Sequence, residues 1–169
     1  MSISSQIMAV SLVAIVGIAN PSAMVTKARA GMLVTGGSQP LSPEFVYRVF
    51  AGHSADWGGG SYAFWAPDGV FYSVNTAEQS LGYGKWYATS SGRMCYEADW
   101  VWRQDFGVEQ KAVKTCTRFR MDPGGEMWST TGNQTGPWFP FTTDNLTLGN
   151  SVAPIYSAMY SRMGLPLRQ

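Results

Sequence analysis

The chain has 169 residues with 12 Lys and Arg against 11 Asp and Glu, and no basic stripe gathers them, so nucleic acid is excluded as a partner. Hydrophobic residues make up 45% and charged residues 14%, which excludes a disordered chain and allows one buried core. The 14% of aromatic residues and the 19 glycines favour short strands and tight turns over long helices.

Residues 1–30 are interpreted as a signal peptide. Ile7 to Ile18 form an uncharged apolar run as long as a signal peptide's hydrophobic region and shorter than the about 20 residues of a membrane span. Cleavage is expected after Ala23 or Ala30, and the second site agrees better with the A-x-A preference. No Lys or Arg precedes the run, so a retained membrane anchor and a buried core helix stay as alternatives. The sequence predicts a periplasmic or secreted protein.

Residues 31–41 are expected to form a flexible lead, and residues 42–169 a single β-rich domain. The domain begins with helix signals, because Ser42 can cap a helix whose first position is a proline, and Gly52 can end it. The apolar positions of this short helix share one face, at Phe45, Val46, Val49 and Phe50.

From residue 61 the hydrophobic period changes to two, which is typical of strands. Pro67, Asp68 and Gly69 form a turn signal, since proline presets φ and glycine accepts positive φ. Six strands are predicted, over residues 61–66, 70–75, 83–89, 93–102, 111–121 and 126–130. Joined by short turns, they predict a mainly β fold: an antiparallel six-strand meander that forms a curved sheet or a barrel-like domain.

The strand over 93–102 divides its residues between two faces. One face carries Cys95, Glu97 and Asp99. The other is apolar and is predicted to be core, at Met94, Tyr96, Ala98, Trp100 and Trp102.

Cys95 and Cys116 are predicted to form a disulfide, since they are an even pair in a chain expected to reach an oxidising compartment. Placing them opposite each other sets the register of two antiparallel strands. Glu97 then faces Lys114, which supports the pairing, and Arg93 faces Arg118, which opposes it unless solvent or an acidic partner intervenes.

The last part of the chain combines a loop and a helix. Residues 132–150 show no period, and residues 137–141 are expected to lie as a loop over apolar surface. A C-terminal helix is predicted to begin at a Ser151 cap and to end at Gly164 and Pro166. Its apolar positions recur at helical spacing, at Val152, Ile155, Tyr156, Met159, Tyr160 and Met163. Both helices are expected to pack on the sheet.

Catalytic signals are sparse. His53 is the chain's single histidine and is interpreted as an exposed loop residue, and no metal site or cofactor is predicted. The glycines at 58–60 are interpreted as a turn into the first strand. Glu97 and Asp99 lie on one strand face, as a pair of hydrolytic carboxylates would, although the expected Glu97–Lys114 contact favours a structural role.

Aromatic residues beside cations or prolines are the candidates for ligand binding, because stacking platforms for sugars and apolar groups have this composition. An ordinary half-buried sheet has it too. The candidates are Trp86, Trp100, Trp102, Trp138 and Phe139.

Residues 42–131 resemble a family of exported bacterial proteins known as domain of unknown function 995. The resemblance is carried by Trp57-Gly58-Gly59-Gly60, Tyr62 to Gly69, Gly84-Lys85-Trp86-Tyr87 and Gly92 to Tyr96, and then by Cys116, Arg118 and Trp128. It implies export and a β-rich fold and brings no catalytic residue.

Three functions follow in order of preference. The first is a non-enzymatic structural or interaction role in the cell envelope or outside the cell, with another envelope protein as the expected kind of partner. The second is a small binding module for an apolar or carbohydrate ligand, and the third is a hydrolase that uses Glu97 and Asp99.

Overall fold

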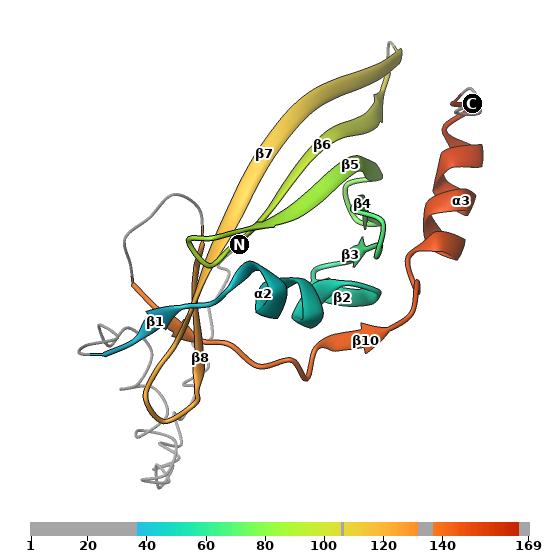
Figure 1. The fold of residues 1–169 in the computed structure, drawn as a ribbon. Coiled ribbons are helices and arrows are strands. Elements are labelled where there is room, and N and C mark those ends of the chain that lie inside the picture. The colour runs from blue at the N-terminus through green and yellow to red at the C-terminus, as the bar shows by residue number, and fades with distance from the viewer. Residues whose placement is uncertain (1–36, 106, 132–136, 166–169) are drawn as a thin grey trace, which may run out of the picture.

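The computed structural model describes residues 37–105, 107–131 and 137–165. In these ranges one antiparallel sheet has the order β10-β2-β3-β4-β5-β6-β7-β8-β9, and β1 pairs with the end of β7 (Figure 1). The strands are β1 Gln39–Pro40, β2 His53–Gly58, β3 Ser61–Trp65, β4 Val70–Asn75, β5 Ser80–Thr89, β6 Arg93–Gln104, β7 Gly107–Met121, β8 Met127–Thr131, β9 Phe139–Pro140 and β10 Leu146–Leu148. The helices are α2 Pro43–Phe50 and α3 Ala153–Arg162. The mainly β class is confirmed. Of the two expected forms, a curved sheet or a barrel-like domain, the structure shows the curved sheet, which is not closed.

The six strands expected from the sequence are β3 to β8, each paired with the next. Cys95 and Cys116 form the disulfide between β6 and β7, in the expected register. In the chain-entropy model, a crosslink that closes a loop of this length contributes about 3 kcal/mol to the free energy of unfolding. Glu97 therefore faces Lys114, and Arg93 faces Arg118.

Two glycines of the family motifs allow close approaches of backbone. A Cβ on Gly84 would lie 2.0 Å from the backbone oxygen of Glu97, so no side chain fits between β5 and β6 at this point. Gly92 has φ +68°, and a Cβ there would lie 2.6 Å from the backbone oxygen of Phe119. At both positions only glycine fits, because a Cβ would clash with the backbone of a neighbouring strand.

Strand β2 was missed by the sequence analysis. The structure corrects the assignment of His53 to an exposed loop: it is the first residue of β2 and is half-buried, with Nδ1 3.1 Å from the oxygen of Ala51. The six residues of β2 show no clear hydrophobic alternation, and they become a strand because β3 pairs with one side and β10 with the other. The glycines at 58–60 form the expected turn, each with positive φ.

Three further short strands extend the sheet beyond the predicted meander. Residues 39–41, expected to be part of a flexible lead, include β1, and Leu41 is buried in the core. The segment after β8 contains β9 and β10, although its sequence shows no period. Strands of two or three residues are too short to produce a sequence period, and only their pairing partners define them.

The sheet buries both faces. On the face covered by α2, the core contains Val46, Phe50, Ala63, Trp65, Phe71, Met94, Ala98 and Phe119. On the opposite face, α3 packs over β4 and β5 around Phe64, Val74, Leu81, Val101, Val152, Met159 and Met163. Figure 1 shows the two helices well apart, with α2 beside β2 and α3 at the C-terminal end.

This two-sided core corrects the expected core face of β6. Met94 and Ala98 are buried as expected, and Tyr96 is partly buried against them. Trp100, however, is only half-buried and belongs to neither core, whereas Val101 from the supposedly outer face is buried under α3. Trp102 is partly buried against the α3 core. The single-face assumption fails because α3 covers the second face of the sheet.

The helix ends are set by polar caps. Ser42 caps α2 as expected, since its hydroxyl accepts a hydrogen bond from the backbone N–H of Phe45 at 3.2 Å. At α3 the N-cap residue is Val152, which makes no side-chain cap hydrogen bond, so the expected Ser151 cap is not formed. Asn150, not Ser151, accepts from the backbone N–H groups of Val152 and Ala153, at 3.1 and 2.9 Å. Asparagine two or three residues before a helix competes well for this role.

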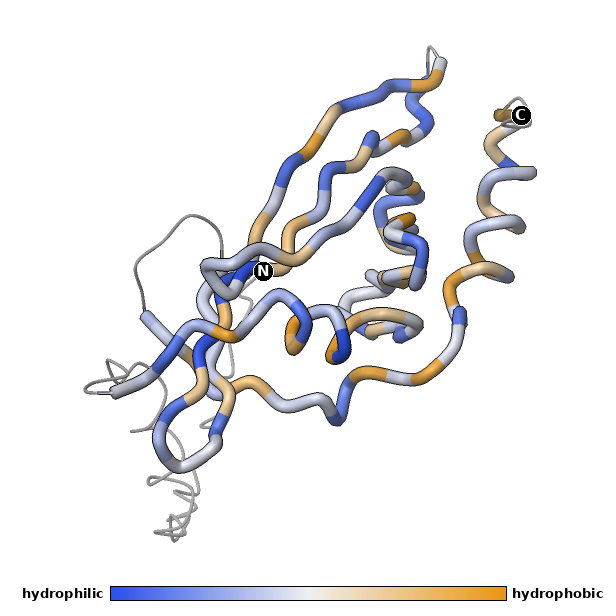
Figure 2. The backbone as a smooth tube through the Cα atoms, viewed as in Figure 1, coloured by the Kyte–Doolittle hydropathy of each residue, from blue (hydrophilic) through white to orange (hydrophobic). Residues whose placement is uncertain are grey.

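The outer ends of β6 and β7 project from the body of the domain. Residues 107–112 of β7 are exposed, and Val108 is 45% exposed. Figure 2 shows this arm as largely hydrophilic, whereas apolar residues recur along the segment from β10 into α3. Only the β6 side of this arm contributes to a core, through Val101 and Trp102, which pack toward α3.

Candidate functional site

A cavity of about 270 Å³ lies on the face of the sheet that α2 covers. Its apolar walls come from Phe50, Ala55, Trp57, Trp65, Met94, Tyr96, Phe119, Phe141 and Leu146. A few polar side chains complete the lining, at Thr115, Thr117, Ser129 and Asn145. Apolar walls with a small number of polar groups are typical of sites for small molecules.

Trp65, one of the residues that line the cavity, carries an unused hydrogen-bond donor. Its side chain is 1% exposed, and its ring packs edge-on against Phe50 with centroids 4.9 Å apart. The indole Nε1–H is buried and has no hydrogen-bond partner. A buried donor without an acceptor costs roughly 1–3 kcal/mol, so an acceptor placed in the cavity would gain a preformed partner.

Trp57 is the most exposed aromatic residue of the cavity lining. It is 42% exposed, and its ring stacks on Phe71 and Tyr96 with centroid distances of 6.3 and 6.1 Å. Phe71 and Tyr96 are themselves stacked at 4.4 Å with planes 8° apart. Trp57 thus packs on an aromatic stack while part of its indole remains accessible to solvent.

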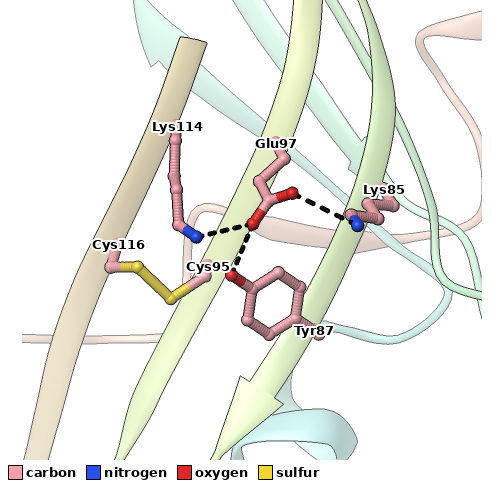
Figure 3. A network of polar contacts seen from close by, with 6 residues as sticks. All are labelled: Lys85, Tyr87, Cys95, Glu97, Lys114 and Cys116. Atoms are coloured by element: carbon pink, nitrogen blue, oxygen red, sulfur yellow. Dashed lines mark hydrogen bonds and ion pairs between the residues drawn. A yellow bond between two sulfur atoms is a disulfide. The ribbon is translucent and has the colours of Figure 1, made fainter.

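The expected carboxylate pair, Glu97 and Asp99, lies elsewhere, on the opposite face of β6. Figure 3 shows Glu97 with its polar contacts. Glu97 contacts Lys114 at 2.7 Å and Lys85 at 3.2 Å, and it accepts a hydrogen bond from the Tyr87 hydroxyl at 2.8 Å. The hydrogen bond from Lys114, followed by those from Tyr87 and Lys85, lowers the pKa of Glu97 to about 2. A carboxylate held ionised by three donors is unsuited to deliver a proton.

Asp99 lies two residues beyond Glu97, and both line an open surface depression of about 540 Å³. The depression also includes Lys85 and Lys114, the two cations that hold Glu97. The two carboxylates therefore share a face as expected, but their surroundings are open and one of them is fully engaged.

The five predicted ligand residues are dispersed over the molecule. Trp86 is buried and donates its indole N–H to the oxygen of Ala66 at 2.8 Å. Its ring stacks on Tyr47 and lines an open groove of about 740 Å³ between α2 and the turn at 67–69. The groove is larger than the cavity, but its indole donor is already used.

Trp100 and Trp102 share a separate depression of about 330 Å³ with Glu78 and Ser80. Trp138 is buried, with the guanidinium of Arg120 5.4 Å from its ring centroid. Its neighbour Phe139 is 43% exposed in β9. None of the five candidates lines the cavity on the α2 face.

The residues that line the cavity were not singled out by sequence. Trp57 and Trp65 both occur in the motifs that carry the family resemblance, which was the available signal. This signal did not mark Trp57 as a ligand residue, because the strand that contains Trp57 was not predicted from the sequence. Neither its position beside Tyr96 nor the unused donor of Trp65 can be deduced without the curvature of the sheet.

Two kinds of feature are absent from the described residues. No group of three or more His, Cys, Asp or Glu side chains in these ranges is placed to hold a metal ion. Neither described helix has the length and hydrophobicity that crossing a membrane requires.

Comparison with known proteins gives one result. A family model described as protein of unknown function (DUF995) matches residues 12–159. No curated protein and no solved structure matches the chain. The matched range includes every residue that carries the resemblance noted in the sequence, and the whole lining of the cavity.

Proposed function

We propose that this chain, which belongs to the DUF995 family, is an exported protein that binds a small, mainly apolar ligand in the cavity between α2 and the sheet. The observation that carries this proposal is the unpaired, buried indole N–H of Trp65, a residue that lines an aromatic cavity. Native proteins rarely leave such donors unsatisfied, and a ligand acceptor atom would satisfy it.

The volume and lining define the ligand class. About 270 Å³ lies just below the roughly 300–1,000 Å³ of sites for drug-sized molecules, so the ligand is small. The aromatic lining favours a ring or short hydrocarbon, and the Trp65 donor favours one acceptor oxygen on it. A free sugar fits less well, because its hydroxyls would meet mainly apolar walls.

Export is part of the same proposal. The Cys95–Cys116 disulfide supports it, because such bonds persist in oxidising compartments. The proposed signal peptide, residues 1–30, and both of its cleavage sites lie outside the described residues. Intact-mass measurement of the protein recovered from the periplasm or the medium tests export: a mature N-terminus at Met24 or Gly31 is expected, and full-length protein found in the cytosol alone would contradict it.

Hydrolysis by Glu97 and Asp99 has less support. The two lysines and the tyrosine that surround Glu97 hold it as an anion, whereas a general acid needs a raised pKa. The structural or interaction role is the second candidate function, and the exposed arm of β6 and β7 favours it, since the exposed residues of β7 offer a surface to a partner.

Binding of acetophenone, an aromatic ring with one carbonyl acceptor, tests the proposal. Isothermal titration should show saturable 1:1 binding to the wild type. Thr115→Phe places a ring in the cavity beside Tyr96, its cross-strand neighbour, and should weaken binding at least tenfold. The control Trp102→Phe changes an indole outside the cavity and should bind within twofold of the wild type.

Near-ultraviolet circular dichroism establishes that both variants are folded. Equal binding of acetophenone by the wild type and a folded Thr115→Phe variant would place the probe elsewhere and overturn the proposal. Absence of saturable binding by the wild type would overturn it as well.

A further inference from the structure

Four polar side chains form a row across the sheet on the face opposite the cavity. Thr89 of β5 pairs with Arg93 of β6, Arg93 pairs with Arg118 of β7, and Arg118 pairs with Thr130 of β8. Directly opposite residues in antiparallel strands project to the same side with Cβ atoms about 5 Å apart. The row therefore places two arginine residues side by side, with a threonine on each flank.

The two arginines lack an acidic partner among the described residues. The ion pairs that the structure shows on this face join Glu97 to Lys85 and Lys114, two rows further along the strands. Glu97 is thus already engaged by two cations and a hydroxyl. Like charges placed directly opposite each other destabilise a strand pair, so an uncompensated arginine pair needs an explanation.

The arginines of this row are partly shielded from water. Arg93 and Arg118 are both half-buried, and Thr130 is 2% exposed. The Nε atom of Arg93 is buried and makes no hydrogen bond within the described structure. A guanidinium N–H removed from water without an acceptor is unfavourable, and an anion at this position would satisfy it.

The disulfide fixes this arrangement. Cys95 lies two residues after Arg93 on β6, and Cys116 lies two residues before Arg118 on β7, so the crosslink is the next row on the same face. A covalent bond in the adjacent row prevents the strands from slipping to separate the two positive charges. Held in this way, the arginines form a preorganised site for an anion.

We infer that Arg93 and Arg118 bind a phosphate group. Each guanidinium offers a planar fork of N–H donors that matches a phosphate oxygen pair, and two arginines balance the charge of a dianion. Thr89, whose hydroxyl lies 3.0 Å from the Ser91 hydroxyl, and the buried Thr130 flank the pair. The phosphate can belong to a free anion or to the headgroup of an anionic lipid, which present the same chemistry.

Inorganic phosphate and lipid vesicles distinguish these two sources. Phosphate is titrated into full-length mature protein at constant ionic strength and followed by the ¹H–¹⁵N resonance of Arg93 Nε. Vesicles of phosphatidylglycerol in phosphatidylcholine are tested by cosedimentation. Response to phosphate alone identifies a soluble anion, and cosedimentation that depends on both arginines identifies a lipid headgroup; response to neither overturns the inference.

Arg118→Gln should weaken the binding of phosphate, or of vesicles, at least tenfold, and Arg118→Lys, which keeps the charge and loses the fork, should weaken it severalfold. Lys114→Gln is the matched control, because it removes the same charge from the same face of β7 outside the row. It should bind within twofold of the wild type. Equal losses for Arg118→Gln and Lys114→Gln would mean general attraction by charge and would overturn the site.

Stability gives a second readout that needs no ligand. Because the paired arginines repel each other, Arg118→Gln should melt at or above the wild-type temperature in phosphate-free buffer. Phosphate should raise the melting temperature of the wild type and not that of the variant. A variant that unfolds in phosphate-free buffer would show that Arg118 is structural, and the inference would then be wrong.

Discussion

The rings of Trp57 and Tyr96 lie stacked, with centroids 6.1 Å apart and planes inclined by 26°. Trp57 belongs to β2 and Tyr96 to β6, and β3, β4 and β5 separate these strands in the order of the sheet. Neighbouring strands are about 4.8 Å apart, so strands four places apart meet through their side chains only if the sheet is strongly curved. This contact therefore reports the curvature that encloses the cavity.

Replacing Trp57 should affect ligand binding more than stability. Trp57→Ala removes a half-exposed ring, so the free energy of unfolding should fall by only about 1 kcal/mol, while acetophenone should bind several times more weakly. Tyr47→Ala is the matched control, because Tyr47 is also 42% exposed and also stacks on a tryptophan, outside the cavity. Urea unfolding and calorimetric titration check both variants. Unchanged acetophenone affinity in Trp57→Ala would show that the ring does not cover the site.

The corrected core makes a prediction about two aromatic residues. Phe71 is fully buried between Trp65 and Tyr96, so Phe71→Ala should lower the free energy of unfolding by about 3–5 kcal/mol. Trp100→Ala should cost clearly less, although its ring is larger, because Trp100 is half-buried and belongs to neither core. Thermal and urea melts compare the two. If Trp100→Ala proved the more damaging, the division into two cores would be wrong.

A single methyl group should disrupt the sheet at Gly84. In Gly84→Ala the new Cβ would lie 2.0 Å from the Glu97 oxygen and 2.6 Å from the Ala98 Cα, both backbone atoms that cannot turn away. A loss of about 1–3 kcal/mol or more is expected. Gly124→Ala is a milder control, since its Cβ would meet only the Asp122 side chain at 3.3 Å. Equal melting temperatures for the two variants would contradict the close approach of β5 and β6.

Acid should remove the contribution of Glu97 to stability. Its pKa is lowered to about 2 from an ordinary value of 4.5, so the folded state favours the ionised form. The stabilisation is therefore complete above about pH 4.5 and is lost as the pH falls through about 2. Urea midpoints of the wild type and Glu97→Gln should differ most near neutral pH and converge toward pH 2. A difference that stays constant over this range would show that the Glu97 contacts are not ionic.

The sequence was sufficient where local rules and strand pairing agree. Ser42 and Gly52 mark the two ends of a helix, and the turn at 67–69 joins two strands. The cysteine register aligns β6 with β7. Each of these follows from a few neighbouring residues or from one covalent constraint. They sufficed to predict the antiparallel meander and the Glu97–Lys114 contact on one face of it.

Long-range features could not be predicted in this way. Strand β2 exists because two partners pair with it, and Val101 is buried because α3 covers a face that alternation alone assigns to solvent. The cavity depends on both the curvature of the sheet and the placement of α2. The candidate ligand residues were therefore chosen by composition, and the structure disperses them while it brings Trp57 and Trp65 together.

The most direct test of ligand binding observes the Trp65 indole itself. Acetophenone and α-methylstyrene have nearly the same shape, but only acetophenone carries an oxygen acceptor. In ¹H–¹⁵N spectra, acetophenone should move the Trp65 Nε1–H proton downfield, whereas α-methylstyrene should bind without this shift. Acetophenone should also bind roughly 2–10 times more tightly, as one net hydrogen bond allows, and Trp65→Phe should abolish the preference. Identical Trp65 shifts with both compounds, or a shift at Trp102 in place of Trp65, would contradict the proposed site.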